Sequence, residues 1–241
     1  MQVIRGDDYQ SWLYSFGDDL IAVDPWLTNQ QQFPILPWLL KRDASERSYL
    51  ISNNLIDKVT ALIITAHFSD HLDAKSLSLF AKSTPIFTTN EAMESLVKLG
   101  FTSITVVKVG RTYKLGAMDL TIHEAGHPYQ TTTFAYLIEC NSKRLFHEAH
   151  MVSPALRLEP LDAVILSVDQ VKVFGLIQVS MNLDQARLVA QKLNADYLLP
   201  TGIAPSKTRG LIAKLLYIKE FYNKLSTIHA VCRKSGDSLI L

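Results

Sequence analysis

The sequence has few of the features that mark secreted, redox-active or nucleic-acid-binding proteins. Its 241 residues include only Cys140 and Cys232, which cannot form a disulfide framework and lack the C-x-x-C spacing of zinc or redox motifs. The formal net charge is +1 and the basic residues are dispersed along the chain, so the electrostatic footprint of a nucleic-acid binder is missing. We therefore expect a cytoplasmic protein without a nucleic-acid partner.

Signal peptides, bilayer-spanning runs and two common catalytic motifs are also missing. The first residues include Arg5, Asp7 and Asp8 and contain no apolar signal-peptide segment. The longest relevant uncharged stretch, from Pro25 to Leu40, is too short and too interrupted by glutamines and prolines to span a bilayer. No glycine-rich phosphate loop and no G-x-S-x-G nucleophile elbow occurs, which disfavours a serine hydrolase.

Hydrophobic residues make up 48% of the chain, enough for a sizeable core, and we expect a single domain over residues 1–241. Residues 26–57 are expected to form a long irregular excursion. The patterns of apolar residues predict an α/β (α+β) fold in which two sheets pack face to face with helices outside. The expected strands are 12–16, 20–23, 62–66, 85–89, 104–109, 119–123, 132–139, 143–146, 163–168, 197–200, 228–231 and 238–241, and the expected helices are 74–82, 91–99, 183–193 and 206–225.

The segment His67-Phe68-Ser69-Asp70-His71 carries the strongest chemical signal, because it follows the buried strand that ends at Ala66. Two imidazoles and a carboxylate on so short a segment can converge on one metal ion. A pair of histidines at a strand end can equally serve as hydrogen-bonding residues of a loop. The adjacent carboxylate of Asp70 favours the metal-binding interpretation.

A second segment, His123-Glu124-Ala125-Gly126-His127, formally matches the H-E-x-x-H pattern of metalloproteases. That motif works only on a helix. Here the preceding residues alternate like a strand, Gly126 is a poor helix former and Pro128 follows at once. A metalloprotease helix is therefore disfavoured, while His127 at the end of a strand remains a candidate metal ligand.

Three further segments are candidates for the site. Glu148, after the strand that ends at Phe146, is either a carboxylate ligand or part of a salt-bridged surface turn. Gly202 follows another buried strand. The loop with Phe33, Trp38 and Leu39 could line an apolar substrate cleft, contact a membrane surface or a partner, or pack on the core.

With these residues in order, the chain resembles the metallo-β-lactamase superfamily, in particular its UlaG-like, lactonase-like branch. The family pattern is H-x-H-x-D-H, and this sequence offers His67, Ser69, Asp70 and His71 at those places. His127 resembles the next histidine ligand, Glu148 falls where the family usually has a bridging aspartate, and Gly202 falls where the final histidine usually stands. The resemblance covers most of the chain and implies a four-layer αβ/βα sandwich with a metal site at one edge of the sheets.

The resemblance also implies hydrolysis by a metal-bound hydroxide. Asp70 would bind the metal and orient the hydroxide, and the other metal ligands would be His67, His71, His127 and Glu148. Zinc is favoured as the divalent metal, with manganese or iron as alternatives. Ser69 and Gly202 stand in place of imidazoles, so one ion is expected at most, unless His123, His147 or His150 compensates; a metal-free site is the third outcome.

We therefore expect a metal-dependent hydrolase that acts on a small-molecule ester, lactone or phosphoester. Trp38, Ser69 and Gly202 are expected to lie at the substrate. The alternative is a non-catalytic protein of the same fold that binds a ligand, a lipid surface or a partner. A homo-oligomer is compatible with either function.

Overall fold

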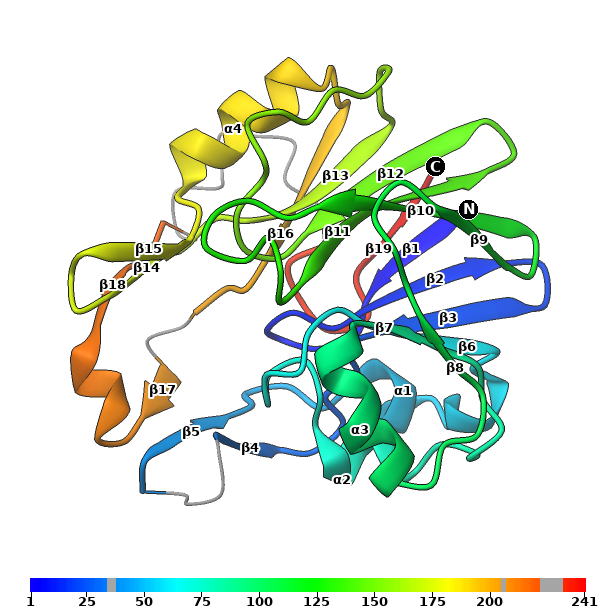
Figure 1. The fold of residues 1–241 in the computed structure, drawn as a ribbon, viewed down its shortest axis with the longest axis horizontal. Coiled ribbons are helices and arrows are strands. Elements are labelled where there is room, and N and C mark those ends of the chain that lie inside the picture. The colour runs from blue at the N-terminus through cyan, green and yellow to red at the C-terminus, as the bar shows by residue number, and fades with distance from the viewer. Residues whose placement is uncertain (34–37, 205–206, 222–231) are drawn as a thin grey trace.

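Two β-sheets form the centre of the molecule (Figure 1). The structure is a computed structural model that describes residues 1–33, 38–204, 207–221 and 232–241. The first sheet has the order β19-β1-β2-β3-β6-β7-β8, with β1 (Gln2–Arg5), β2 (Trp12–Phe16), β3 (Asp19–Val23), β6 (Ala61–Ile64), β7 (Ile86–Thr88), β8 (Ile104–Val106) and β19 (Ser238–Ile240). The second has the order β16-β13-β12-β11-β10-β9, with β9 (Thr112–Leu115), β10 (Met118–Glu124), β11 (Phe134–Cys140), β12 (Lys143–Glu148), β13 (Ala163–Ser167) and β16 (Tyr197–Thr201).

The two sheets pack face to face because successive strand residues point to opposite sides. Ile63 of β6 and Ile165 of β13 belong to the core between the sheets. Leu62 and Ile64 instead face the helices α1 (Tyr49–Ser52), α2 (Ala74–Leu77) and α3 (Asn90–Lys98) on the outer side of the first sheet. Val164 similarly faces α4 (Leu183–Lys192) on the outer side of the second sheet. The predicted α/β sandwich of two sheets between helical layers is confirmed.

Local capping explains where the helices begin. The Asp73 side chain accepts a hydrogen bond from the Ser76 amide, as expected for the start of α2, although this helix ends at Leu77 and not at residue 82. Asn182 and Gln185 form a capping box at the start of α4. For α3 the cap is Thr89, and the helix begins at Asn90, one residue before the predicted start at residue 91. Within the described residues, no helix has the length and apolar character needed to cross a bilayer.

Two small sheets lie beside the sandwich and were not predicted. One has the order β15-β14-β18 and the other β17-β5-β4. They contain β14 (Gln170–Val173), β15 (Ile177–Ser180), β18 (Leu216–Lys219), β4 (Gln30–Phe33), β5 (Leu40–Asp43) and β17 (Thr208–Arg209), while the short helices η1 (Ile56–Lys58) and η3 (Ile212–Leu215) lie in the connecting segments.

The predicted helix over 206–225 is wrong for residues 207–221, which form β17, η3 and β18. Strand β18 pairs with β14, and this long-range pairing replaces the local hydrogen bonds of a helix. Gly210 also lies against the backbone of Leu39, where an added Cβ would be 2.5 Å from the Leu39 carbonyl oxygen. Residues 222–225 and the predicted strand 228–231 lie outside the described residues.

The strand directions determine where candidate site residues gather. β3 and β6 are parallel, so Asp24 and the segment from Thr65 to His71 leave the first sheet at the same edge. β12, β13 and β16 are also parallel, so Glu148 and Gly202 follow strand ends at one edge of the second sheet. A backbone bridge between Ala66 and Thr133 joins the two sheets at this edge.

Candidate active site

A cavity of about 490 Å³ lies at this edge. Its apolar walls include Phe68 and Tyr129 from loops, and Val171 and Leu216 from the sheet β15-β14-β18. The polar lining residues include Gln10, His67, Ser69, Asp70, His150, Ser180 and Thr208. Among the described residues, Asp70 is the single carboxylate of the lining, and none of the lining residues is a lysine or arginine. The cavity is therefore suited to a neutral, largely apolar molecule.

His71 lies behind the cavity wall and is held by carboxylate and hydroxyl groups. Its Nδ1 is 2.7 Å from Oδ2 of Asp24 and 2.8 Å from Oγ1 of Thr65. Burial alone would lower the pKa of His71, but the carboxylates, first Asp24 and then Asp70, outweigh it and raise the pKa to about 9. Asp24 thus fixes the ring so that Nε2 points toward the cavity side.

His150 forms the next layer and does line the cavity. Its Nε2 is 3.2 Å from Nε2 of His71, and its ring packs on Tyr129 with the centroids 4.3 Å apart. The Oδ2 atom of Asp70 is 3.8 Å from Nε2 of His71. Asp70, His71 and His150 therefore form one polar cluster at the wall of the cavity.

Glu148 supports this cluster from the end of β12. Its Oε1 accepts a hydrogen bond from the amide of His150 at 2.8 Å and lies 3.7 Å from Nδ1 of the same residue. Its Oε2 is buried and has no hydrogen-bond partner among the described residues. Glu148 thus orients His150 and adds negative charge beside it.

His147 and His123, the other two histidines considered as replacements for the imidazoles missing at Ser69 and Gly202, do not line the cavity. The Nδ1 atom of His147 is 2.8 Å from the Tyr14 hydroxyl and 2.7 Å from the Tyr136 hydroxyl, in the core between the sheets. His123 packs against Phe146, which belongs to the core on the α4 side of the second sheet. Of the three, only His150 lines the cavity.

The structure separates the predicted metal ligands into two groups. Asp70, His71 and Glu148 lie in or next to the polar cluster. His67 is exposed, lines the cavity and packs on Phe68 with the ring centroids 4.3 Å apart. His127 is exposed and is not among the residues that line the cavity.

The spacing of the H-x-H-x-D-H pattern explains part of the separation of the predicted metal ligands. It also corrects the alignment of that pattern with this sequence. Counted back from Asp70 and His71, the six-residue pattern H-x-H-x-D-H places its first two histidines at Ala66 and Phe68, not at His67 and Ser69. Ala66 is buried in the bridge to Thr133, and Phe68 forms part of the apolar wall. Two imidazole positions of the pattern are thus occupied by side chains that cannot bind a metal.

Of the three predicted substrate-binding residues, two line the cavity and one does not. Ser69 and Gly202 line the cavity, and Gly202 has a positive φ of 59° while its amide donates to the Tyr9 carbonyl. Trp38 is 59% exposed and is not a lining residue, whereas Leu40, two residues further on, is one. Phe33 lies in β4, and its side chain is outside the described part of the structure.

A metal ion was the other expectation for this site. In the part of the chain that the structure describes, no three His, Cys, Asp or Glu side chains are placed so that they could hold one ion. His71 directs Nδ1 to Asp24 and Nε2 to His150, so neither nitrogen is free in this arrangement. The side chains as placed do not fit the ion that the resemblance implies.

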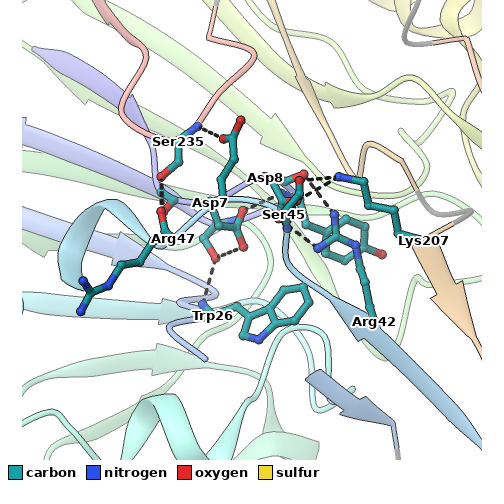
Figure 2. Close-up of polar contacts among 12 residues, drawn as sticks. Asp7, Asp8, Trp26, Arg42, Ser45, Arg47, Lys207 and Ser235 are labelled. Carbon is teal, nitrogen blue, oxygen red and sulfur yellow. Dashed lines mark hydrogen bonds and ion pairs between the residues drawn. The ribbon is translucent and has the colours of Figure 1, made fainter. Parts of the chain in front are cut away.

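A buried ion-pair network holds the sheet β17-β5-β4 beside the cavity (Figure 2). The Arg42 guanidinium is fully buried, donates to Asp8 at 3.1 Å and lies over the rings of Tyr9 and Trp26. Lys207 donates to Asp8 as well, at 3.1 Å. Burial would raise the pKa of Asp8, but Arg42 and the hydrogen bonds of Ser45 hold it well below its usual range. These contacts fix the strands that supply Leu40 and Thr208 to the cavity wall.

Sequence reasoning missed Asp24, Gln10 and Tyr129 as site residues. Asp24 could have been found because it ends a strand that is parallel to the one before His67. Gln10 donates to the Asp70 carbonyl from the segment before β2, and no local pattern marks it. Tyr129 follows His127 in a loop, where only the fold brings it onto His150.

Comparisons with known proteins agree with this architecture. A family model described as "Beta-lactamase superfamily domain" matches residues 7–202. No curated protein sequence matches the chain. Among solved structures, a possible metal-dependent hydrolase from Veillonella parvula DSM 2008 has 16% identity and a TM-score of 0.68, with 100% of this chain and 99% of that chain covered.

Two further solved structures are similar over their whole length. The metallo-beta-lactamase fold protein YhfI from Bacillus subtilis has 18% identity and a TM-score of 0.66, with 99% of each chain covered. An isothiocyanate hydrolase from Delia radicum gut bacteria has 13% identity and a TM-score of 0.70, with 100% of this chain and 99% of that chain covered. At such identities the likeness establishes a shared fold and leaves the activity to be argued from the site.

Proposed function

The chain belongs to the β-lactamase superfamily, since the family model covers most of its length, and from this membership we propose that it is a hydrolase of small, neutral esters or lactones. The observation that carries the proposal is the cavity of about 490 Å³ at the strand ends, with Asp70 and His150 in a largely apolar lining. Hydrolase names among the similar structures support the reaction class.

The charge of the lining favours a neutral substrate over a phosphoester. Binding a phosphate in a pocket usually requires arginine, lysine or a row of backbone amides. The lining has no basic side chain and has the carboxylate of Asp70, which would repel a phosphoester. An ester or lactone carries no charge at the scissile bond and meets no such penalty.

Asp70 is the proposed general base. It is the carboxylate that a water molecule in the cavity can reach, and removal of a proton from that water would make it nucleophilic. The water proton passes to Asp70 as the oxygen attacks the substrate carbonyl. The tetrahedral intermediate then breaks its bond to the alcohol oxygen, and the proton passes from Asp70 to that oxygen as the alcohol leaves. The protonated His71, 3.2 Å from His150, places positive charge at the wall where negative charge develops on the carbonyl oxygen.

The test is a panel of nitrophenyl esters of increasing acyl length, lactones and nitrophenyl phosphate, assayed with the wild type and Asp70→Asn. We expect ester or lactone turnover that falls by roughly 100-fold or more in Asp70→Asn, the usual loss when a general base is removed. Asp184→Asn, on the exposed side of α4, is the matched control and should keep full activity. Equal rates in wild type and Asp70→Asn, or a preference for the phosphate, would contradict the proposal.

The same preparations of the wild type and Asp70→Asn test whether hydrolysis depends on a bound metal, as the resemblance implies. Zinc, manganese and iron contents are measured after purification without chelator, and turnover is measured with and without each added ion. Because the described donors do not converge on one ion, we expect no stoichiometric metal and no stimulation. Stoichiometric metal together with metal-stimulated turnover would restore the metal-dependent mechanism.

A non-catalytic ligand-binding protein is the second candidate, and it is supported by Ala66, Phe68 and Gly202 at the positions of three family histidines. It predicts that an ester analogue binds without turnover and that Asp70→Asn leaves this binding unchanged. Loss of binding in Asp70→Asn would count against it. Fluorescence titration of the analogue measures binding, and product formation from the ester distinguishes the two candidates, because the hydrolase consumes the ester and the binding protein does not.

A further inference from the structure

Exposed apolar side chains gather on the small sheets beside the cavity. Thirteen large hydrophobic side chains are exposed in the described part of the chain, and seven of these lie on or next to the two small sheets: Trp38, Phe174, Leu176, Ile177, Leu211, Leu215 and Tyr217. We call these seven residues the apolar rim. Leu176 at the tip of the β14–β15 hairpin is 84% exposed, so the described residues leave its side chain largely uncovered.

Backbone contacts join the members of the apolar rim into one surface. The amide of Phe174 donates to the Leu215 carbonyl at 2.9 Å, and the amide of Leu211 donates to the Trp38 carbonyl at 3.1 Å. In Figure 1 the strands β14, β15 and β18 project away from the two main sheets. The apolar rim therefore occupies a protruding part of the molecule and not a shallow patch on the sandwich.

The apolar rim is continuous with the cavity wall. Directly opposite residues of antiparallel strands have side chains on the same face. Val173 is opposite both Leu216 of β18 and Ile177 of β15, so these three side chains share a face. Because Leu216 lines the cavity, this face leads from the exposed Ile177 into the cavity.

The two segments that carry most of the apolar rim are basic, and the nearest carboxylates are Asp43 in β5, the buried Asp169 before β14 and the exposed Glu220 after β18. Residues 170–180 and 207–219 contain five basic residues and no aspartate or glutamate, in a chain whose overall numbers of basic and acidic residues are nearly equal. The five are Lys172, Lys207, Arg209, Lys214 and Lys219. Lys207 pairs with Asp8, while Lys214 and Lys219 are exposed. An apolar tip with lysines on β14, β18 and η3 beside it complements a surface that is apolar inside and anionic outside.

We propose that the apolar rim docks on an anionic lipid surface, with Phe174 and Leu176 inserted between the headgroups and the lysines on their phosphates. In this orientation the apolar face of the β15-β14-β18 sheet connects the lipid to the cavity. A second copy of the chain is the weaker fit, because a symmetric contact would bring the same lysines of two copies together. Docking goes beyond the proposed hydrolysis and does not depend on it.

The experiment is flotation of the full chain with vesicles of phosphatidylglycerol mixed with phosphatidylcholine, and with vesicles of phosphatidylcholine alone. We expect binding to the mixed vesicles, much weaker binding to the neutral ones, and loss of binding at about 1 M salt, where the Debye length is about 3 Å. Lys214→Gln with Lys219→Gln should weaken partitioning by about fivefold for each lysine removed. Phe174→Ser with Leu176→Ser should weaken it by roughly tenfold or more.

Leu188→Ser is the matched control, because Leu188 is also a largely exposed apolar residue but lies on α4. It should bind vesicles like the wild type, and circular dichroism should show that all variants are folded. Absence of vesicle binding, or equal loss in Leu188→Ser and in the double serine variant, would overturn the proposal. A dimer in analytical ultracentrifugation that dissociates in the double serine variant would overturn it in favour of a second copy.

Discussion

At the scale of single residues, the groups around two buried histidines give them opposite protonation states. His71 is paired with Asp24, and its pKa is raised to about 9. His147 lies between the hydroxyls of Tyr14 and Tyr136, where burial and then the nearby His71 and His150 lower its pKa to about 3. His147 is therefore neutral in the folded protein at any pH at which the protein is handled.

Protonation of His147 should destabilise the folded protein in mild acid. Between the ordinary histidine value of 6.5 and about 3, the unfolded chain binds a proton that the folded chain does not. The contribution of neutral His147 is fully present above pH 6.5 and falls by about 1.4 kcal/mol for each pH unit below it. Urea unfolding at about pH 7 and about pH 5 measures this difference.

The variant His147→Leu is the control for this pH dependence. Tyr14 and Tyr136 remain hydrogen-bonded to each other, since their hydroxyls are 2.9 Å apart. We expect a smaller loss of stability between the two pH values than in the wild type. An unchanged pH dependence would assign the acid sensitivity to other groups.

Gly126 is a position where backbone contact leaves no room for a side chain. A Cβ there would lie 2.6 Å from the Met151 carbonyl oxygen, to which the Gly126 amide donates. Gly126→Ala should cost about 1–3 kcal/mol of stability by overpacking and should displace Tyr129, whose amide donates to the Gly126 carbonyl. We therefore expect the ester analogue to bind more weakly to Gly126→Ala than to the wild type, as measured by fluorescence titration.

Gly17→Ala is the control for Gly126→Ala. It tests the loss of stability that a glycine replacement causes through backbone conformation, without a change at the cavity. Gly17 has a φ of 59° and nothing within 4 Å of an added Cβ, so the variant loses about 1 kcal/mol through its backbone conformation alone. Ligand binding should stay at the wild-type level. Equal binding by Gly126→Ala and Gly17→Ala would show that the loop of Tyr129 does not shape the cavity.

At the scale of elements, the sequence predicts regular packing better than it predicts the small sheets. Helix α4 was expected because Asn182 caps it and its apolar residues face the second sheet. Residues 206–225 show the same kind of helical pattern, yet β18 forms because β14 offers a partner strand. That partner is distant in sequence, so no local pattern could reveal the pairing.

The sheet β17-β5-β4 should depend on the buried pair of Asp8 and Arg42. Asp8→Asn leaves the fully buried Arg42 guanidinium without its ionic partner, which costs about 3–5 kcal/mol for buried pairs. We expect faster amide hydrogen exchange in β5 and β17 than in β6. The exposed pair of Glu94 and Lys98 is the control, and Glu94→Gln should leave the stability nearly unchanged. Uniform exchange rates in Asp8→Asn would argue against a local role.

At the scale of the whole molecule, the two sheets should unfold together because they share one core. Ile63 from the first sheet and Ile165 from the second are fully buried in that core. Ile63→Ala and Ile165→Ala should each lose about 2–5 kcal/mol and keep a single unfolding transition in calorimetry. Val97→Ala, at an exposed position on α3, should change the midpoint little. Two separate transitions in either variant would show that the sheets unfold independently.

The layered fold could be predicted from the sequence, and the site only in part. Alternation in strands such as residues 61–64 determines which side chains face the other sheet, and this pattern is local. Asp70, His71 and Glu148 lie near one another because they stand at strand ends on one edge of the two sheets, and their role in the site stays a prediction. Gln10 and Tyr129 reach this edge from loops that only the fold brings there, so no local pattern marks them. The UlaG-like branch remains a prediction.

The backbone bridge between Ala66 and Thr133 has a mechanical consequence for ligand entry. It joins the two main sheets beside the cavity, so the floor cannot widen by separating them without breaking the bridge. The opposite walls come from the small sheets, through Leu40, Val171 and Leu216. A ligand that is too large for the cavity must therefore displace these walls, because the bridge holds the main sheets at a fixed spacing.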